Sequence, residues 1–210
     1  MDDLQAIGER ALGHLEVKNA ARDRALQTSR LLIRHCAHAI RAVHRGQRGP
    51  AQEELDQARS LAASLKAELQ PYPDLYHAGY SQDALKELAE ATIVYALVAG
   101  EALPSPEDLG VEYAAYLAGL GEAVGELRRR ALDVLRQDGV EEAERLLSAM
   151  DDIYDLLVTV DYPDAITGGL RRITDMVRGV VERTRGDLTT TYQQRALKAA
   201  LRDVEGRLRK

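Results

Sequence analysis

The sequence contains no Trp, no Phe and a single cysteine, Cys36, among its 210 residues. One cysteine excludes an intrachain disulfide bond and a cysteine-rich zinc module. Nine tyrosines without a surplus of β-branched residues argue against a sandwich, a barrel or a wide parallel sheet. The sequence also lacks a signal-peptide pattern at its N-terminus and any uncharged run of 18 residues. We therefore expect a soluble cytoplasmic protein with no membrane partner.

Helix-forming residues dominate what is present. The chain has 31 Ala and 30 Leu, which together make up 61 of the 210 positions. Gly and Pro occur in clusters, such as residues 46–50 and 71–73, that separate segments with apolar residues at helical spacing. These features predict an all-α, bundle-like single domain over residues 1–210 with seven helices. The expected helices cover residues 2–45, 51–69, 81–100, 104–137, 140–160, 165–185 and 191–209.

Motifs of the common hydrolases and nucleotide-binding proteins are absent. The sequence has no nucleophile elbow, P-loop, Rossmann fingerprint or HExxH pattern. Its five histidines are dispersed and do not have the spacing of a zinc site. Tyr72, Tyr76 and Tyr80, at four-residue spacing in a loop bounded by proline, could stack on nucleic-acid bases or pack the loop against the bundle. The sequence leaves both alternatives open.

Two pairs of glutamates are the best candidates for chemistry. Glu87 and Glu90 are three residues apart, and Glu122 and Glu126 are four apart, so each pair projects from one face of an otherwise apolar helix. Two facing helices that each present such a pair can hold a hard divalent cation, and oxygen ligands favour Mg²⁺ or Mn²⁺. Such an ion activates water and stabilises charge on a phosphate during hydrolysis. The alternative is that both pairs lie on solvated helix faces.

Basic residues are segregated along the chain. The sequence has 23 Arg and 5 Lys, and its net charge of -6 argues against a protein that coats nucleic acid with its whole surface. Residues 24–52, however, contain no carboxylate, and arginines there recur on one helix face. This arginine stripe consists of Arg30, Arg34, Arg41 and Arg45, with His38 between them. Its spacing suits the phosphates of one nucleic-acid strand, and a solvated helix face is the alternative.

Several strings in the sequence resemble the translin family, in particular its archaeal members and its TRAX branch. The most distinctive string is DYPDAITGGLRR at residues 161–172, which ERTRGDLT follows at residues 182–189. Nearer the N-terminus, the pair of Arg30 and Arg34 and the string AIRAVHR at residues 39–45 also fit. The resemblance extends from about residue 22 to residue 205.

The resemblance implies a seven-helix subunit that assembles into a hollow homo-octamer and binds single-stranded RNA, or DNA, inside it. TRAX-type subunits of the family are metal-dependent endoribonucleases, whereas translin-type subunits bind without cutting. The string LKELAEA at residues 85–91 places Glu87 and Glu90 on two catalytic positions. The third position, three residues before the GEL string at 125–127 and normally Asp, holds Glu122. Non-cutting members largely keep the GEL string as well, which implies a supporting or structural role for Glu126.

Residue spacing and family resemblance thus predict the same site. Glu87, Glu90 and Glu122 would bind Mg²⁺ or Mn²⁺ and cleave single-stranded or flexible RNA, while the arginine stripe would bind phosphates with little sequence specificity. A translin-like binding protein in which Glu122 no longer supports cutting is the second interpretation. A helical scaffold whose acids pair with arginines of a neighbouring subunit is the third.

Overall fold

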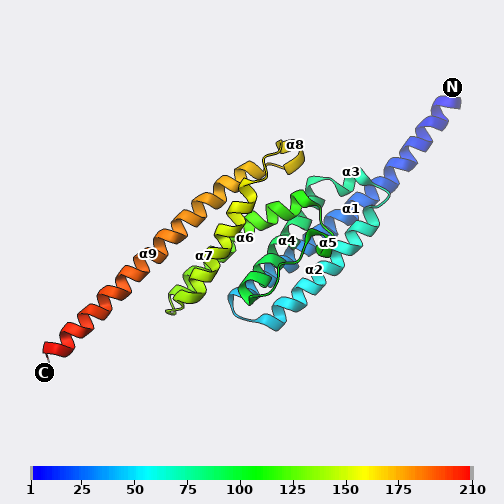
Figure 1. Cartoon of the computed structure of the whole chain (residues 1–210). Helices are drawn as coiled ribbons and strands as arrows, with labels where there is room; N and C mark the ends of the chain where they lie inside the picture. The colour runs from blue at the N-terminus through cyan, green and yellow to red at the C-terminus, as the bar shows by residue number, and fades with distance from the viewer. Residues whose placement is uncertain (1, 209–210) are drawn as a thin grey trace.

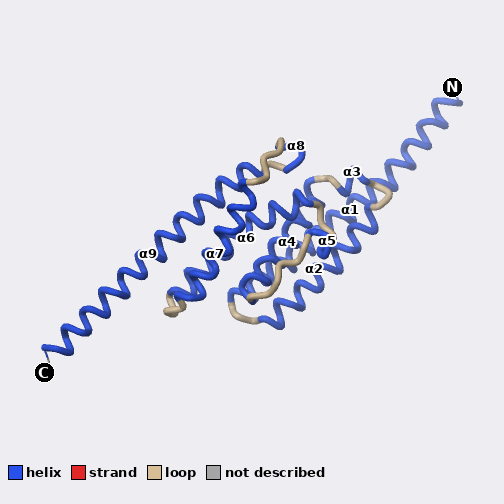
Figure 2. Tube along the Cα trace, in the orientation of Figure 1, coloured by secondary structure: helices blue, strands red, loops and turns tan. Residues whose placement is uncertain are grey.

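Residues 2–208 are described by the computed structural model, and they form helices and loops with no strand in that range (Figures 1 and 2). The all-α fold is thereby confirmed. In chain order the helices are α1 (Asp2–His44), α2 (Arg48–Leu69), α3 (Pro73–Tyr76), α4 (Gly79–Ala99), α5 (Pro106–Leu109), α6 (Tyr113–Leu135), α7 (Val140–Val158), α8 (Asp164–Thr167) and α9 (Leu170–Leu208). Within this range no helix is both long and apolar enough to cross a membrane.

The two helices expected over residues 165–185 and 191–209 are one continuous helix, α9, of 39 residues. The expected helices leave residues 186–190 outside, yet the hydroxyls of Thr189, Thr190 and Thr191 donate to the carbonyl oxygens four residues earlier at 2.8, 3.0 and 2.9 Å. These hydroxyls are satisfied inside the helix and so do not end it. Gly186 adopts the helical conformation as well, so neither feature interrupts α9.

Short helices occupy the connections in which Pro and Gly stop the long ones. Helix α5 begins with a capping box, in which Ser105 Oγ accepts a hydrogen bond from the Asp108 N–H and the Asp108 carboxylate accepts one from the Ser105 N–H. It ends at Gly110, whose φ of 65° lies in the left-handed region that favours glycine. The α5 turn thereby sets the chain direction at which α6 begins.

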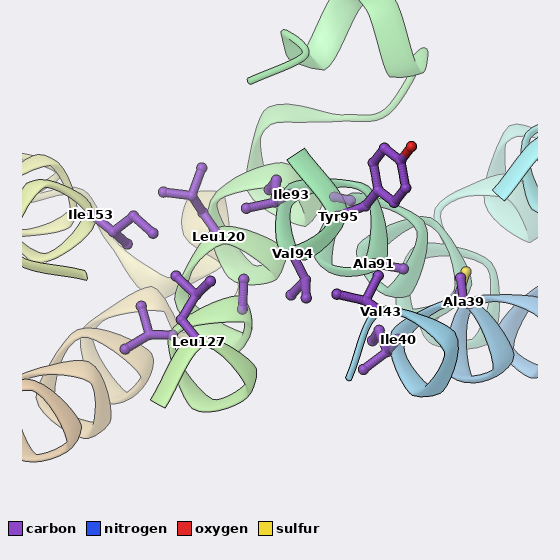
Figure 3. Packing of buried hydrophobic residues seen from close by; sticks show 14 of the residues in the cluster. Ala39, Ile40, Val43, Ala91, Ile93, Val94, Tyr95, Leu120, Leu127 and Ile153 are labelled. Atoms are coloured by element: carbon purple, nitrogen blue, oxygen red, sulfur yellow. The ribbon is translucent and has the colours of Figure 1, made fainter. Parts of the chain in front are cut away.

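Helix α4 lies at the centre of the core. Its residues from Leu88 to Ala96 are all buried, because α4 packs against α1, α2 and α6. Figure 3 shows Ile40 and Val43 of α1 and Leu127 of α6 around Val94 of α4, in one buried apolar cluster. Helices α7 and α9 pack against α6 and complete the bundle (Figure 1). Polar groups that α4 and α6 bring together therefore lie beside the buried core.

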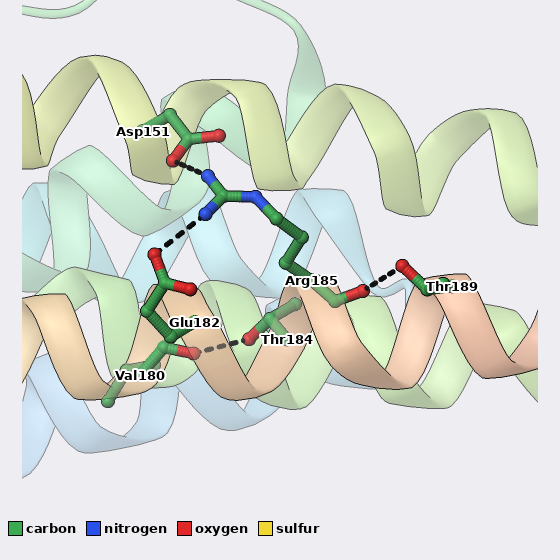
Figure 4. Close-up of polar contacts among 6 residues, drawn as sticks. All are labelled: Asp151, Val180, Glu182, Thr184, Arg185 and Thr189. Atoms are coloured by element: carbon green, nitrogen blue, oxygen red, sulfur yellow. Dashed lines mark hydrogen bonds and ion pairs between the residues drawn. The ribbon is translucent and has the colours of Figure 1, made fainter.

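Arginine contacts tie the C-terminal helix to the bundle. The Arg185 guanidinium of α9 donates to Asp151 of α7 at 2.6 Å and to Glu182 one turn earlier at 2.7 Å (Figure 4). Arg128 of α6 donates to the Thr184 hydroxyl of α9 at 3.0 Å. These arginines join helices of one chain and are engaged with its own acceptors.

The two ends of the chain extend beyond the bundle in opposite directions (Figure 1). Both extensions carry large apolar side chains in the open. On α1 these include Leu4 and Leu12, which are 74% and 69% exposed. On α9, Leu197, Leu201 and Val204 recur at helical spacing and are each more than half exposed. Such apolar rows are typical of surfaces that another protein chain covers.

Candidate functional site

Helices α4 and α6 cross in backbone contact at Gly119. A Cβ atom at this position would lie 2.7 Å from the backbone oxygen of Lys86 and 2.9 Å from the backbone nitrogen of Glu90. Real Cβ atoms do not approach other atoms so closely, so the crossing requires glycine. Glu122 follows Gly119 by about one turn of α6, and the contact therefore brings carboxylates of the two helices together.

Three carboxylates meet beside this crossing. Glu87, Glu90 and Glu122 each offer an oxygen atom, and the three oxygens lie within 4.8 Å of one another. Around one octahedral Mg²⁺ with bonds of about 2.1 Å, neighbouring ligand oxygens are about 3.0 Å apart and opposite ones about 4.2 Å apart, and three ligands include at most one opposite pair. The three residues are therefore close enough to hold a hard divalent cation once their side chains turn toward it, and their oxygen-only chemistry suits Mg²⁺ or Mn²⁺. We call these three residues the acidic cluster.

Glu90 is the buried member of the acidic cluster, with 9% of its surface exposed. Burial, together with the negative charges of Glu87, Glu122 and Glu126, raises the pKa of Glu90 from 4.5 to about 8, although Lys86 opposes the shift. Glu90 therefore keeps its proton at neutral pH when no divalent cation is bound. A bound cation reverses this preference, because it favours the ionised carboxylate.

Lys86 supplies a positive charge to the acidic cluster. Its Nζ atom lies 2.6 Å from Glu122 Oε2 and 3.4 Å from Glu87 Oε1, and its side chain is only 19% exposed. Burial lowers the pKa of Lys86, but the hydrogen bond and the charge of Glu122, with the charge of Glu87, outweigh burial and raise the pKa above its ordinary value. The lysine therefore stays charged and links α4 to α6.

Glu126 has a different partner, the mostly buried His44 of α1. His44 Nε2 lies 2.5 Å from Glu126 Oε2, and Arg129 lies 3.7 Å from the same oxygen. The hydrogen bond and charge of His44 lower the pKa of Glu126, as does Arg129, and outweigh the effect of burial. Among the described residues nothing pairs with His44 Nδ1, which is buried. Glu126 thus joins α6 to α1 at the edge of the acidic cluster.

The arginine stripe does not meet the acidic cluster within one chain. Arg30, Arg34, Arg41 and Arg45 are all exposed, and in the described range none has a carboxylate within 4.0 Å. Cys36 lies on the side of α1 that is buried in the core with Leu88 and Ala89 of α4, and burial together with the charges of Glu87 and Glu90 raises the pKa of its thiol. Arg34 and Arg41 lie about 160° and about 140° of helical rotation from Cys36. The stripe consequently points away from the acids of its own subunit.

His38 differs from the arginines of the stripe because it has an acidic partner. His38 Nδ1 lies 3.3 Å from Glu54 of α2, and His35 Nδ1 lies 2.6 Å from the other oxygen of the same carboxylate. The acid-free run in the sequence concealed this contact, since Glu54 comes from the adjacent helix. His38 is therefore partly engaged within the chain, while the four arginines have no carboxylate partner in the described range and only Arg45 of them donates to a side chain there, Gln47 Oε1 at 2.9 Å.

The tyrosine loop packs against its own chain. Tyr72, Tyr76 and Tyr80 lie against a small buried cluster that includes Leu65, Leu69 and Leu75. The Tyr76 hydroxyl donates to Glu112 at 3.2 Å, and burial together with Glu112 raises the pKa of Tyr76 to about 12. Of the two alternatives, base stacking and packing of the loop against the bundle, the structure therefore shows packing.

A cleft that sequence reasoning did not anticipate adjoins the acidic cluster. It has a volume of about 650 Å³ and lies between α4, the N-terminal half of α6 and α8. Lys86 and Glu122 line it, as do Asp83, Glu112 and Ile166. The only sequence signal for this feature is Lys86 itself, a basic residue inside the acidic string LKELAEA. The cleft provides a route from solvent to the acids.

Solved structures resemble the chain over almost its whole length. AfC3PO in a complex with duplex RNA matches with a TM-score of 0.84 and 36% sequence identity, over 90% of this chain and 97% of that chain. A crystal structure of AfC3PO matches with a TM-score of 0.83, the same identity, and coverage of 90% and 98%. C3PO is the complex of translin and TRAX. The chain belongs to the translin family.

Further relatives of this translin-family chain are more distant. Apo-NeC3PO shares the fold, with a TM-score of 0.80 at 21% identity over 87% of this chain and 96% of that chain. Among curated proteins, the uncharacterized protein MJ0175 of Methanocaldococcus jannaschii is 30% identical over 208 residues, which is 98% of this chain and 90% of that protein. No protein-family model matches the sequence. The acids that the family resemblance selects are the three that meet at the α4–α6 crossing.

Proposed function

We propose that this translin-family chain is a metal-dependent endoribonuclease that binds and cleaves single-stranded or flexible RNA inside a homo-oligomer. The observation that carries the proposal is the acidic cluster, in which the oxygens of Glu87, Glu90 and Glu122 lie within 4.8 Å of one another. The AfC3PO complex with duplex RNA supports RNA as the ligand class. The cytoplasmic location stays a prediction from the sequence.

The acidic cluster would hold Mg²⁺ or Mn²⁺ through its carboxylate oxygens. When bound, such an ion supplies a Lewis acid for a phosphate oxygen and lowers the pKa of a coordinated water. The chain itself contributes placement, because Gly119 holds α4 and α6 in contact and burial shields Glu90 from bulk water. Glu122 has one methylene more than the Asp that the family normally has here, and Lys86 holds its carboxylate toward α4.

The arginine stripe would bind the RNA backbone. Its arginines are exposed and free of carboxylate partners in the described range. They can therefore bind phosphates without first breaking an ion pair within the chain. Because the stripe points away from the acids of its own chain, RNA bound to one subunit's stripe reaches the acidic cluster of another subunit. Exposed leucines on the extensions of α1 and α9 support assembly into such an oligomer. Eight subunits is the number that the family resemblance implies.

A non-catalytic RNA-binding protein is the second candidate. The observation in its favour is Lys86, whose ammonium neutralises part of the acidic cluster without any metal ion. In this case the cluster would hold α4 and α6 together, and the arginine stripe alone would carry the function.

One experiment separates the two candidates. End-labelled single-stranded and duplex RNA are incubated with the full-length protein in Mg²⁺, in Mn²⁺ and in EDTA, alongside Glu87→Gln, Glu90→Gln and Glu122→Gln. A nuclease requires cleavage that EDTA abolishes and that each variant lowers by at least about 100-fold while RNA binding persists. Glu53→Gln, an exposed glutamate on α2, is the control and should cleave like the wild type.

Each alternative outcome has a clear meaning. Metal-independent cleavage, or cleavage that survives all three substitutions, contradicts the proposed site. RNA binding without cleavage by the wild type in either metal leaves the non-catalytic binding protein. The single-stranded and duplex arms measure the preference for strandedness directly.

A further inference from the structure

The acidic cluster already contains a cation, the ammonium group of Lys86. Its Nζ atom lies 2.6 Å from Glu122 Oε2 and 3.4 Å from Glu87 Oε1, so it touches two of the three carboxylates that would bind a metal ion. The side chain is largely shielded from solvent, with 19% exposed. The contact is therefore a specific internal ion pair across the α4–α6 crossing and differs from the mobile ion pairs of an exposed surface.

A divalent cation and this ammonium group would bind the same carboxylates. The ammonium donates hydrogen bonds to carboxylate lone pairs that a metal ion would use, and an ion at the centre of the cluster would be close to Nζ, with like charge. Bound Mg²⁺ also demands short contacts of about 2.0 to 2.1 Å in a near-ideal arrangement, so the carboxylates must turn toward the ion and away from Nζ. Metal and ammonium therefore compete for these carboxylates.

We propose that Lys86 is a built-in competitor for the metal ion: its ammonium group occupies the acidic cluster when no metal is bound and leaves for the adjoining cleft when a divalent cation enters. This inference rests on the metal site of the proposed function. It adds a residue that sets how tightly the metal is held, and it explains how three carboxylates stay close together in the metal-free chain.

The cleft between α4, α6 and α8 offers a place for the displaced ammonium. Lys86 lines this cleft together with Asp83 and Glu112, two carboxylates outside the acidic cluster. Asp83 is three residues before Lys86 and thus lies on the same face of α4. The flexible four-carbon stem of lysine allows Nζ to swing from Glu122 toward Asp83 without a change in the backbone. The ammonium can consequently leave the cluster and remain paired with an acid.

Measurements of Mn²⁺ binding test this competition directly. Isothermal titration of the full-length protein, without RNA, should give about tenfold tighter Mn²⁺ binding for Lys86→Met and for Lys86→Gln than for the wild type. Lys86→Arg keeps the positive charge, and its affinity should stay within about threefold of the wild type. Lys66→Met, which removes a lysine of α2 that contacts the Gly110 carbonyl oxygen, is the matched control and should leave the affinity unchanged. Asp83→Asn should weaken Mn²⁺ binding, because the displaced ammonium loses a partner.

Thermal unfolding provides a second measurement that is independent of RNA. In EDTA, Lys86→Met should unfold at a lower temperature than the wild type, since the acids lose their counterion, and saturating Mn²⁺ should raise its unfolding temperature by more. Unchanged or weaker Mn²⁺ binding by both neutral variants would overturn the competition while leaving the metal site intact. Failure of the wild type and both neutral variants to bind Mn²⁺ would overturn the metal site and the proposed nuclease together.

Discussion

Glu90 is the member of the acidic cluster on which burial and charge act together. A solvated glutamate has a pKa near 4.3, and burial beside Glu87, Glu122 and Glu126 raises the pKa of Glu90 to about 8. Such a shift means that the fold tolerates the ionised form poorly while no cation is bound. The same feature is typical of sites that bind a metal or transfer a proton, where charged groups are held together against their repulsion.

The raised pKa predicts how metal-free stability depends on pH. Between about pH 4.5 and pH 8 the folded chain keeps the Glu90 proton that the unfolded chain has lost, so stability falls as pH rises, by at most about 1.4 kcal/mol for each pH unit from this group. Glu90→Gln removes the titration. We expect Glu90→Gln to be more stable than the wild type at pH 8 in EDTA and to differ little from it at pH 5.

Denaturant unfolding in EDTA at several pH values measures this difference. The control is Glu53→Gln, whose stability should follow that of the wild type at every pH because Glu53 is exposed. A stability difference between Glu90→Gln and the wild type that does not grow from pH 5 to pH 8 would contradict the raised pKa. Added Mn²⁺ should reverse the order, since the ionised Glu90 then has a cation to bind.

At the scale of the helix, the site depends on one glycine contact. Gly119 allows α4 and α6 to touch, and a methyl group there would lie 2.7 Å from the backbone oxygen of Lys86. Backbone atoms cannot rotate away as side chains do, so the helices must separate. The acids of the two helices would separate with them.

Gly119→Ala should therefore damage stability and metal binding together. We expect a loss of about 1 to 3 kcal/mol, which is the usual cost of overpacking, and markedly weaker Mn²⁺ binding. Gly125→Ala is the matched control on the same helix, because no described atom lies within 4 Å of its Cβ position. It should stabilise the chain slightly, since alanine favours a helix over glycine. Equal stability of the two variants by denaturant unfolding would disprove the crossing argument.

The helices themselves could be predicted from the sequence, and the reason is local. Alanine and leucine favour helices, and Gly and Pro clusters mark where most of them end, as at Gly46 and Pro71. The break expected near Thr189 was wrong because side-chain hydroxyls bonded within the helix, a detail that composition does not reveal. Local sequence signals thus predict most of the helices. They fail where a polar side chain can form its hydrogen bonds either inside a helix or at a helix end.

The site could be predicted only in part, because it depends on contacts between helices. Spacing and family resemblance selected Glu87, Glu90 and Glu122, and these three do meet. The ion pair of Lys86 with Glu122 joins residues 36 positions apart, and no periodicity within one helix indicates it. The partner of His38, Glu54, was missed for the same reason.

At the scale of the whole molecule, the arginine stripe and the acidic cluster lie on different surfaces of the chain. The net charge is -6, yet the arginine stripe on α1 is free of carboxylate partners in the described range, while the acidic cluster lies on the opposite side of that helix. One chain cannot apply both surfaces to the same short stretch of RNA. A closed assembly can, if the stripe of one subunit faces the acids of another, so the nuclease that we propose requires assembly.

The extension of α9 provides a test of this condition. Leu201 is 54% exposed on a helix that leaves the bundle, so Leu201→Glu should not disturb the core of the subunit. It places a charge in the apolar row with Leu197 and Val204, and burying that charge against another chain is costly. We expect light scattering to report smaller species than for the wild type, with an unchanged helical circular dichroism spectrum. Single-stranded RNA should bind at least about tenfold more weakly, because fewer stripes act on one strand.

Ala199→Glu is the control for this experiment. It adds the same charge to the same exposed helix, about 160° of rotation away from Leu201, and should leave both mass and RNA affinity unchanged. If Leu201→Glu keeps the wild-type mass, the apolar row of α9 is not an interface between subunits. If its mass falls while RNA cleavage per subunit persists at the wild-type rate, a single chain is sufficient, and the separation of arginines and acids does not require a second subunit.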